Sequence, residues 1–322
     1  PMPITIAVVG TGHLGSIHAR LWKDQEGAEL TAIVDPDEQR GRAVAAEYGA
    51  TWYAHVDDMP DVDAVTIAAP TTYHHALALR CLERGFHTFI EKPVTATYDE
   101  AVDILAKSAV TNRVIQVGHV ERFNPAVRAL ASVEVSPLFI EAHRLAPFKP
   151  RAIDVSVIHD LMIHDIDLIL WLTQSEVVDV RATGVAVLTD THDICNARIE
   201  FASGCVANLT ASRISAKPMR KMRVFQRDSY ISLDLGSGSV ESYRLIEASD
   251  VDVSHQVPLG TVSTSFGDKM IVFDTPHVET VNAIAEEQRS FLDSIRTGKP
   301  SAVTLHEAAE AVRIAEWIER LL

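Results

Sequence analysis

A glycine pattern near the start of the chain restricts the fold more than any other feature. Gly10, Gly12 and Gly15 form G-x-G-x-x-G, reading GTGHLG, directly after the apolar run Ile4–Val9 and before the helical pattern Leu14–Trp22. The glycines permit a tight turn, and the start of the helix offers free N–H groups to a phosphate. In this context the pattern predicts the first strand, loop and helix of a dinucleotide-binding sheet. A glycine-rich turn without a ligand is the alternative.

Short apolar runs alternate with helical patterns over roughly the first 120 residues, which predicts a parallel sheet covered by helices. The predicted strands are Ile4–Val9, Glu29–Val34, Ala64–Ala68, Thr88–Glu91 and Val114–Val117. The predicted helices are Leu14–Trp22, Gln39–Tyr48, Tyr73–Arg84 and Asp99–Lys107. We therefore expect a doubly wound, Rossmann-type α/β domain over residues 1–122.

Residues 123–322 follow a different pattern and predict a second domain, of the α+β class. Its main helix is expected at Ile158–Leu172, and helices at Val278–Thr297 and His306–Leu322 close the chain. The β-rich stretches are Val177–Leu188, Ala197–Phe201, Cys205–Ser212, Met222–Gln226, Tyr230–Leu233 and Val240–Leu245. Adjacent strands joined by short turns predict an open, mostly antiparallel sheet. The segment Ala248–Thr275 has little periodicity and is expected to be a long loop or a mobile strand.

Asp35 ends the second predicted strand, 20 positions after Gly15 (35 − 15). A carboxylate at this position can accept hydrogen bonds from both ribose hydroxyls of a dinucleotide and repels a 2′-phosphate. The first basic residue after it is Arg40. The sequence therefore favours NAD over NADP. Asp35 also suits a turn before Pro36, which does not exclude the first role.

The composition indicates in which cell compartment the protein works and which classes of partner it does not bind. A formal charge of −15 disfavours nucleic acid and anionic membranes. We expect neither a signal peptide nor a membrane span, since no apolar run approaches about 18 residues. Cys81, Cys195 and Cys205 have no paired metal spacing and predict buried, reduced thiols in the cytoplasm. The adjacent pair His74 and His75 does not suit one metal ion, so no metal is expected.

Glu91, Lys92 and Pro93 stand at the end of the fourth predicted strand. The carboxyl edge of such a sheet is where ligands bind. A lysine beside a nicotinamide would be partly desolvated and could hydrogen-bond a substrate hydroxyl. A solvated surface lysine is the alternative.

A second polar group lies in the helical segment IHDLMIHDIDLILWL. The spacings of Asp160, His164 and Asp167, four and three, place them on one face of an α-helix. Polar groups among so many apolar neighbours are costly unless they are paired. Asp160 could orient His164, which can accept an alcohol proton at neutral pH. An Asp–His pair that only satisfies a core helix remains possible, and His159 and Asp165 have no expected role.

Together these motifs resemble those of the Gfo/Idh/MocA family of sugar-type dehydrogenases, over essentially the whole chain. The resemblance rests on GTGHLG, on APTTYHHALA from Ala69, on EKP from Glu91, on D-x-x-x-H-x-x-D from Asp160 and on the closing segment EEQRSFLDSIRTGKP. It implies a Rossmann domain followed by an open sheet that often mediates oligomerisation. Two departures are Met162, where the family has a glycine, and Asp154–Ile158, which replaces a glycine-rich lead-in.

The resemblance also implies roles for single residues. Lys92, Asp160 and His164 correspond to the family's catalytic lysine, aspartate and histidine. Residues expected to contact NAD are Gly10, Gly12, His13, Leu14, Gly15, Asp35, Ala69, Pro70, His74, Glu91 and Lys92. Residues expected to contact substrate are Lys92, Arg122, Asn124 and His164.

Within the family, Val117–Val127 and Asp160–Leu168 look most like the enzymes that oxidise the 3-hydroxyl of UDP-N-acetylglucosamine. Two basic clusters could hold the diphosphate of such a nucleotide sugar. They comprise Arg213, Lys217, Arg220, Lys221, Arg223 and Arg227, and Arg144, Lys149 and Arg151. A solvated or intersubunit strand edge is the alternative for these residues.

The expected reaction is hydride transfer from a secondary carbinol to nicotinamide, in a homodimer or homotetramer. His164 would take the hydroxyl proton, and Lys92 would hydrogen-bond the same oxygen. Three other functions remain open: a dehydrogenase of inositols or simple sugars, an NAD-dependent glycosidase, and an NAD-binding sensor without turnover.

Overall fold

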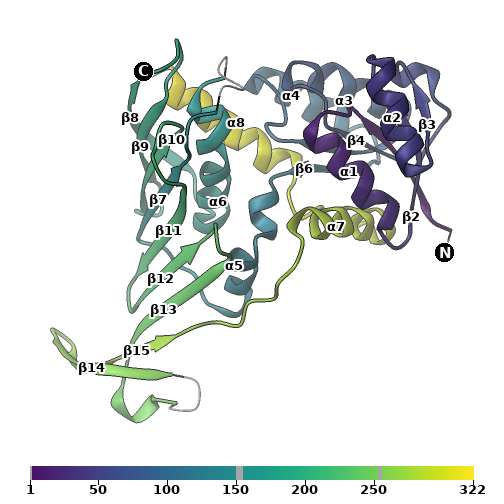
Figure 1. The fold of residues 1–322 in the computed structure, drawn as a ribbon. Helices are drawn as coiled ribbons and strands as arrows, with labels where there is room; N and C mark the ends of the chain where they lie inside the picture. The colour runs from purple at the N-terminus through teal and green to yellow at the C-terminus, as the bar shows by residue number, and fades with distance from the viewer. Residues whose placement is uncertain (1, 150–154, 253–255) are drawn as a thin grey trace. The chain divides into compact units, whose positions relative to one another are not determined.

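The computed structural model describes residues 2–149, 155–252 and 256–322 and divides into two compact units (Figure 1). The first unit comprises Pro1–Phe123 and Asn282–Glu316, and the second comprises Asn124–Val281 and Trp317–Leu322. The chain thus returns to its first unit near the C-terminus, whereas the sequence pattern suggests a single crossing after residue 122.

The first unit contains a six-stranded sheet in the order β3-β2-β1-β4-β5-β6, with every neighbouring pair parallel. The strands are β1 (Ile4–Val9), β2 (Ala28–Val34), β3 (Thr51–Tyr53), β4 (Ala64–Ile67), β5 (His87–Glu91) and β6 (Ile115–Gly118). The predicted doubly wound sheet is confirmed. Strand β3 was not predicted, because three residues carry too little pattern.

The α-helices that begin in the described part of this unit are α1 (His13–Asp24), α2 (Glu38–Tyr48), α3 (His74–Glu83), α4 (Tyr98–Ser108), α7 (Ala283–Thr297) and α8 (Leu305–Glu319). The last residues of α8, from Trp317 on, belong to the second unit. Short 3₁₀ turns are η1 (Val56–Asp58), η2 (Thr71–Tyr73) and η3 (Val120–Phe123). Local chemistry sets several boundaries. Helix α4, for example, begins at a capping box in which Thr97 and Glu100 satisfy each other's backbone N–H groups.

Helix α7 belongs to the first unit because of its apolar face. The ring of Phe291 is fully buried and lies edge-on to Trp22 and Phe89, with centroids 6.5 and 5.9 Å away. Burying one such side chain contributes about 1.5–3 kcal/mol. This packing brings the polar side chains of α7 against α1.

The second unit contains a nine-stranded sheet in the order β14-β15-β13-β12-β11-β7-β10-β9-β8. The strands are β7 (Phe139–Leu145), β8 (Val177–Val185), β9 (Ile194–Phe201), β10 (Val206–Ser212), β11 (Met219–Gln226), β12 (Ser229–Asp234), β13 (Ser239–Ile246), β14 (Val257–Thr264) and β15 (Gly267–Asp274). Among the described strands of this sheet, the β7–β10 pair alone is parallel. The open, mostly antiparallel sheet is therefore confirmed.

Of the two alternatives expected for Ala248–Thr275, a long loop or a mobile strand, most of the segment is strand. Strands β14 and β15 form an antiparallel hairpin at the far end of the sheet from β8 (Figure 1). Strand β14 is largely exposed on both faces, so its sequence lacks the alternation that marks a half-buried strand. Within the same segment, η6 spans Ala248–Asp250, and residues 253–255 lie outside the described residues.

The helical elements of the second unit are α5 (Pro125–Arg128), η4 (Ala129–Ser132), η5 (Ile158–Met162) and α6 (Ile163–Thr173). The expected helix at Ile158–Leu172 exists, but its first turn, η5, is π-helical. None of the helices among the described residues has the length and apolarity needed to cross a membrane.

All three cysteines are free and buried, as expected. Burial raises the pKa of the Cys81 and Cys195 thiols to about 12 and that of Cys205 to about 11. At neutral pH these side chains therefore act as small apolar residues.

Candidate active site

The glycine loop forms a backbone cradle at the start of α1. Gly10 has φ +89°, and a Cβ on it would lie 2.6 Å from the Ala69 nitrogen. A Cβ on Gly15 would lie 1.8 Å from the Gly10 oxygen, whereas one on Gly12 would meet nothing within 4 Å. Gly12 caps α1 without a side-chain hydrogen bond. The helix start and the open side at Gly12 fit a dinucleotide pyrophosphate, with the exposed His13 beside it.

Asp35, at the end of β2, is almost fully buried. Its carboxylate accepts hydrogen bonds from the Thr11 backbone nitrogen at 2.8 Å, from the Thr11 hydroxyl at 2.5 Å and from the Asp37 nitrogen at 2.9 Å. Arg40 Nη2 lies 2.9 Å from Asp35 Oδ1. Burial alone would raise the pKa of Asp35, but the hydrogen bonds from Thr11 and Arg40 outweigh it and lower that pKa.

A surface hollow of about 460 Å³ lies beside this carboxylate. It is lined by Thr11, Gly12, His13, Ser16, Ile17, Arg20, Arg40 and Tyr48. One concave surface thus includes Gly12 and His13 of the glycine loop, which are predicted cofactor residues, and Arg40, which pairs with Asp35. Arg40 is part of this surface, although the sequence motifs predict no cofactor contact for it.

His74 links two loops at the carboxyl end of the sheet. Its ring nitrogens lie 2.8 Å from the Ala69 carbonyl oxygen and 2.9 Å from the Pro93 carbonyl oxygen. His74 is buried, so its clearest role is to hold the Ala69–Pro70 turn against the segment after Glu91.

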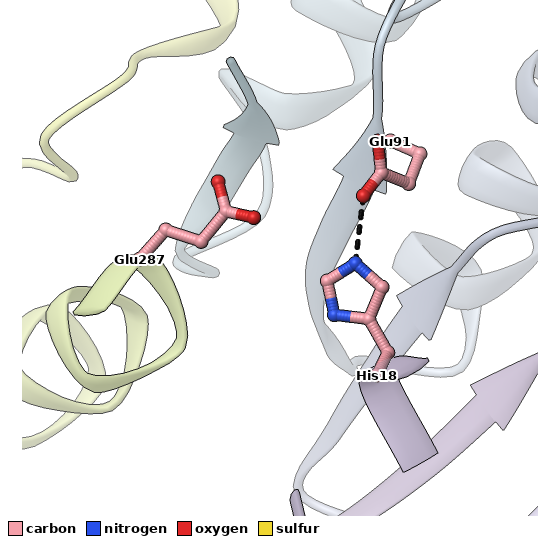
Figure 2. Close-up of side chains that lie close together, drawn as sticks. All are labelled: His18, Glu91 and Glu287. Atoms are coloured by element: carbon pink, nitrogen blue, oxygen red, sulfur yellow. Dashed lines mark hydrogen bonds and ion pairs between the residues drawn. The ribbon is translucent and has the colours of Figure 1, made fainter. Parts of the chain in front are cut away.

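Glu91, at the end of β5, and His18 of α1 form a buried pair (Figure 2). His18 Nε2 lies 2.6 Å from Glu91 Oε1, and the Lys92 backbone nitrogen donates to Glu91 Oε2 at 3.2 Å. Burial alone would raise the pKa of Glu91, but the hydrogen bond from His18 reverses this and lowers it. A Cβ on Gly118 would lie 3.1 Å from Glu91 Oε2, so glycine leaves room for the carboxylate. Lys92 itself is half-buried.

Glu287 of α7 completes a cluster that sequence analysis missed. One ligand atom from each of His18, Glu91 and Glu287 lies within 4.8 Å of the other two, and all three residues are buried. The signal in the sequence is weak, because Glu287 stands among charged residues on a helix with an exposed face. Only the packing of α7 reveals that this carboxylate points inward.

The second unit carries Asp160, His164 and Asp167. His164 and Asp167 lie on α6, while Asp160 lies in the π-helical turn η5. His164 and Asp167 therefore share one face of an α-helix, as their spacing predicts, but Asp160 lies in a wider turn to which α-helical spacing does not apply. Asp160 and His164 are half-buried and Asp167 is fully buried. Met162, where the family has a glycine, is also fully buried.

Several residues of the two basic clusters serve the fold instead of forming a free patch. Arg144 forms an ion pair with Asp165 at 2.8 Å, and Arg213 forms one with Asp193 at 2.9 Å. All four side chains are buried, although Asp165 had no expected role. Arg144 and Arg213 are therefore not free cations that could hold a diphosphate, and the hypothesis is wrong for these two residues.

On strand β11, the positive charges of Lys221 and Arg223 are partly neutralised by carboxylates from other parts of the sequence. Arg223 pairs with Glu141, and Lys221 lies 3.6 Å from Asp234. Lys149, Lys217, Arg220 and Arg227 are exposed, and Arg151 lies outside the described residues.

The two predicted substrate contacts near the first unit's end also have structural partners. Arg122 is buried and donates to Glu307 at 2.9 Å. Asn124 caps α5 and donates to the Leu235 carbonyl oxygen at 2.9 Å. Their roles toward a substrate remain predictions.

Two family models match the chain. Residues 4–119 match the oxidoreductase family with an NAD-binding Rossmann fold, and residues 140–231 match the GFO/IDH/MocA C-terminal domain. UDP-N-acetylglucosamine 3-dehydrogenase of Acidithiobacillus ferrooxidans is 37% identical over 94% of this chain and 96% of its own. The scyllo-inositol 2-dehydrogenase (NAD⁺) of Bacillus subtilis is 31% identical over 66% of this chain and 68% of its own.

Solved structures agree with these matches. The A. ferrooxidans enzyme superposes with a TM-score of 0.90 at 34% identity, covering 100% of this chain and 98% of that one. An Agrobacterium radiobacter oxidoreductase, solved with NAD⁺, L-tartaric acid and magnesium, superposes with a TM-score of 0.82, covering 99% of this chain and 96% of that one. At 15% identity this similarity shows the fold alone. With the glycine cradle, Asp35 and the open sheet, these similarities establish that the chain belongs to the GFO/IDH/MocA family of NAD-dependent oxidoreductases.

Proposed function

We propose that the protein oxidises the 3-hydroxyl of a nucleotide sugar of the UDP-N-acetylglucosamine type. The observation that carries this proposal is the extent of similarity. The relative that acts on UDP-N-acetylglucosamine aligns over 94% of this chain at 37% identity. The inositol dehydrogenases reach 30–36% identity over only 55–66% of it.

In this proposal, NAD held by the first unit would supply the hydride acceptor for the carbinol carbon. Lys92 donates a hydrogen bond to the carbinol oxygen, and His164 takes the hydroxyl proton while Asp160 orients the imidazole. The π-helical turn that carries Asp160 supports a functional role, since such turns occur frequently at functional sites.

Cofactor binding is proposed to use residues of the first unit. The backbone from Gly10 to Gly15 holds the pyrophosphate, and Asp35 binds the adenosine ribose. Ala69, Pro70 and Glu91 line the cofactor's path along the carboxyl end of the sheet. His74 contributes by fixing the two loops that it bridges.

We also propose that the protein works in the cytoplasm as a homodimer or homotetramer. Five aromatic rings run across neighbouring strands of the second unit and are each half-buried: Phe139, Phe225, Tyr230, Tyr243 and Phe273. This partly exposed apolar row suits subunit association. Light scattering on the purified protein tests it, and a monomer at micromolar concentration contradicts it.

The substrate proposal is tested with NAD and a panel of UDP-N-acetylglucosamine, UDP-glucose, free N-acetylglucosamine, myo-inositol and scyllo-inositol. NADH formation is followed while an aminotransferase removes the ketone. The proposal expects the highest kcat/KM with UDP-N-acetylglucosamine. A higher value with an inositol supports the second candidate, an inositol dehydrogenase.

A further inference from the structure

Glu287 is a buried carboxyl group whose surroundings do not suit a negative charge. Its residue is 0% exposed, and neither carboxylate oxygen has a hydrogen-bond partner among the described residues. Figure 2 shows its side chain directed from α7 toward the His18–Glu91 pair. A buried polar group without a partner is rare in native proteins and needs an explanation.

The neighbouring pair fixes where the negative charge lies. Gln288 Nε2 donates to the His18 carbonyl oxygen at 3.2 Å and to His18 Nδ1 at 3.0 Å. Because Nδ1 accepts, the ring proton is on Nε2 and is donated to Glu91. Glu91 also accepts from the Lys92 nitrogen, so Glu91 is the ionised group of the cluster.

A second ionised carboxylate within 4.8 Å would be repelled by Glu91 in this buried site. Burial first, and then the charge of Glu91, raises the pKa of Glu287 well above its usual value. Two more charged residues, Glu121 and Arg122, lie on η3, which packs against α7. Arg122 pairs with Glu307 of α8. Lys92 adds positive charge on the side of Glu91.

A divalent cation is the other way to neutralise two carboxylates. To bind here, a cation would need the lone pair of His18 Nε2. That nitrogen instead carries the proton that it donates in the hydrogen bond to Glu91. The 2.6 Å between Nε2 and Oε1 is also a hydrogen-bond distance. Two ligands about 2.0–2.2 Å from a tetrahedral zinc ion lie farther apart than that. The geometry therefore favours a proton.

We propose that Glu287 is a positioning residue that is a neutral carboxylic acid in the folded protein at neutral pH. Its neutrality leaves Glu91 as the single anion of the cluster, and Glu91 in turn holds the backbone at Lys92. The link to catalysis rests on the proposed function, in which Lys92 contacts the substrate. The protonation state of Glu287 does not depend on it.

The protonation state is tested by infrared spectroscopy and metal analysis of the intact protein at neutral pH. The carbonyl band of a carboxylic acid is expected in the wild type and is lost in Glu287→Gln. The matched control, Glu286→Gln, alters the adjacent residue, which pairs with Arg289, and keeps the band. Absence of the band from the wild type, or one tightly held divalent cation per chain that is lost in Glu287→Gln, overturns the proposal.

The positioning role is tested by the pH dependence of kcat. As pH rises through the pKa of Glu287, a second anion forms, and wild-type kcat is expected to fall. Glu287→Gln stays neutral, so it retains kcat within about 3-fold at neutral pH and loses this alkaline fall, while Glu286→Gln keeps it. An unchanged alkaline fall in Glu287→Gln overturns the positioning role. If Lys92→Ala instead turns over normally, the proposed function fails while the infrared result still decides the state of Glu287.

Discussion

Arg40 lies against Asp35 at the carboxyl end of β2, with 2.9 Å between Nη2 and Oδ1. Thr11 donates twice to the other oxygen of the same carboxylate. Asp35 therefore ties the glycine loop to the start of α2 before any cofactor binds. This double engagement gives the residue a structural role beside the ribose role expected from the sequence.

Asp35→Ser is expected to raise KM for NAD by about 10-fold or more and to relax discrimination against NADP. The variant removes the acceptor for ribose hydroxyls and frees Arg40, a cation that can meet a 2′-phosphate. Steady-state kinetics with both cofactors measure the effect. Asp58→Ser, an exposed aspartate of η1, is the control. An unchanged cofactor preference in Asp35→Ser would remove the residue from this role.

The buried pair Arg144–Asp165 predicts a large loss of stability when one partner is removed. Asp165→Ala leaves a buried guanidinium without its carboxylate, which costs about 3–5 kcal/mol. The control, Glu38→Ala, breaks the exposed pair with Arg42 and should cost at most about 1 kcal/mol. Urea unfolding measures both. Equal losses in the two variants would mean that the buried pair has no special role.

Asp193 predicts part of the acid sensitivity. Burial would raise its pKa, but backbone N–H groups of Leu188 and Val187 and the side chain of Arg213 outweigh burial and lower it. A lowered folded-state pKa gives stability that is present above the unfolded value of 3.8 and is lost as pH falls toward the folded value. Asp193→Asn should therefore be less stable at pH 7 and lose less stability below about pH 5. Parallel stability curves for the two proteins would contradict this.

Much of the first unit could be predicted because its strands and helices are regular and separated by clear breaks. The packing of α7 on the first unit could not be predicted from the sequence. Phe291 and Leu292 are apolar residues that could pack in the core of either unit, and their partners, such as Trp22, are distant in sequence. Strand β7 alternates buried and half-buried residues, yet it lies in a segment with few turn signals. Strand β14 lacks alternation because it is mostly exposed.

The candidate site divides in the same way. The glycines, Asp35 and Lys92 follow from local motifs, since each stands at the end of a strand. Pairings across the fold are invisible in a linear reading. Arg213 stands in a basic run with no acidic neighbour, and its carboxylate partner, Asp193, comes from a turn twenty residues earlier. Glu287 likewise becomes informative only when α7 brings it to Glu91.

The most direct test of the account measures NADH formation with UDP-N-acetylglucosamine by wild type, Lys92→Ala and His164→Ala, beside their NAD affinity. Lys92→Ala removes the hydrogen bond to the carbinol oxygen, and His164→Ala removes the group that takes the hydroxyl proton. Each change should lower kcat by about 10²- to 10⁴-fold. NAD affinity and cooperative unfolding should remain near those of the wild type. Normal turnover by both variants, or no NADH from the wild type with any sugar or inositol of the panel, would contradict the account.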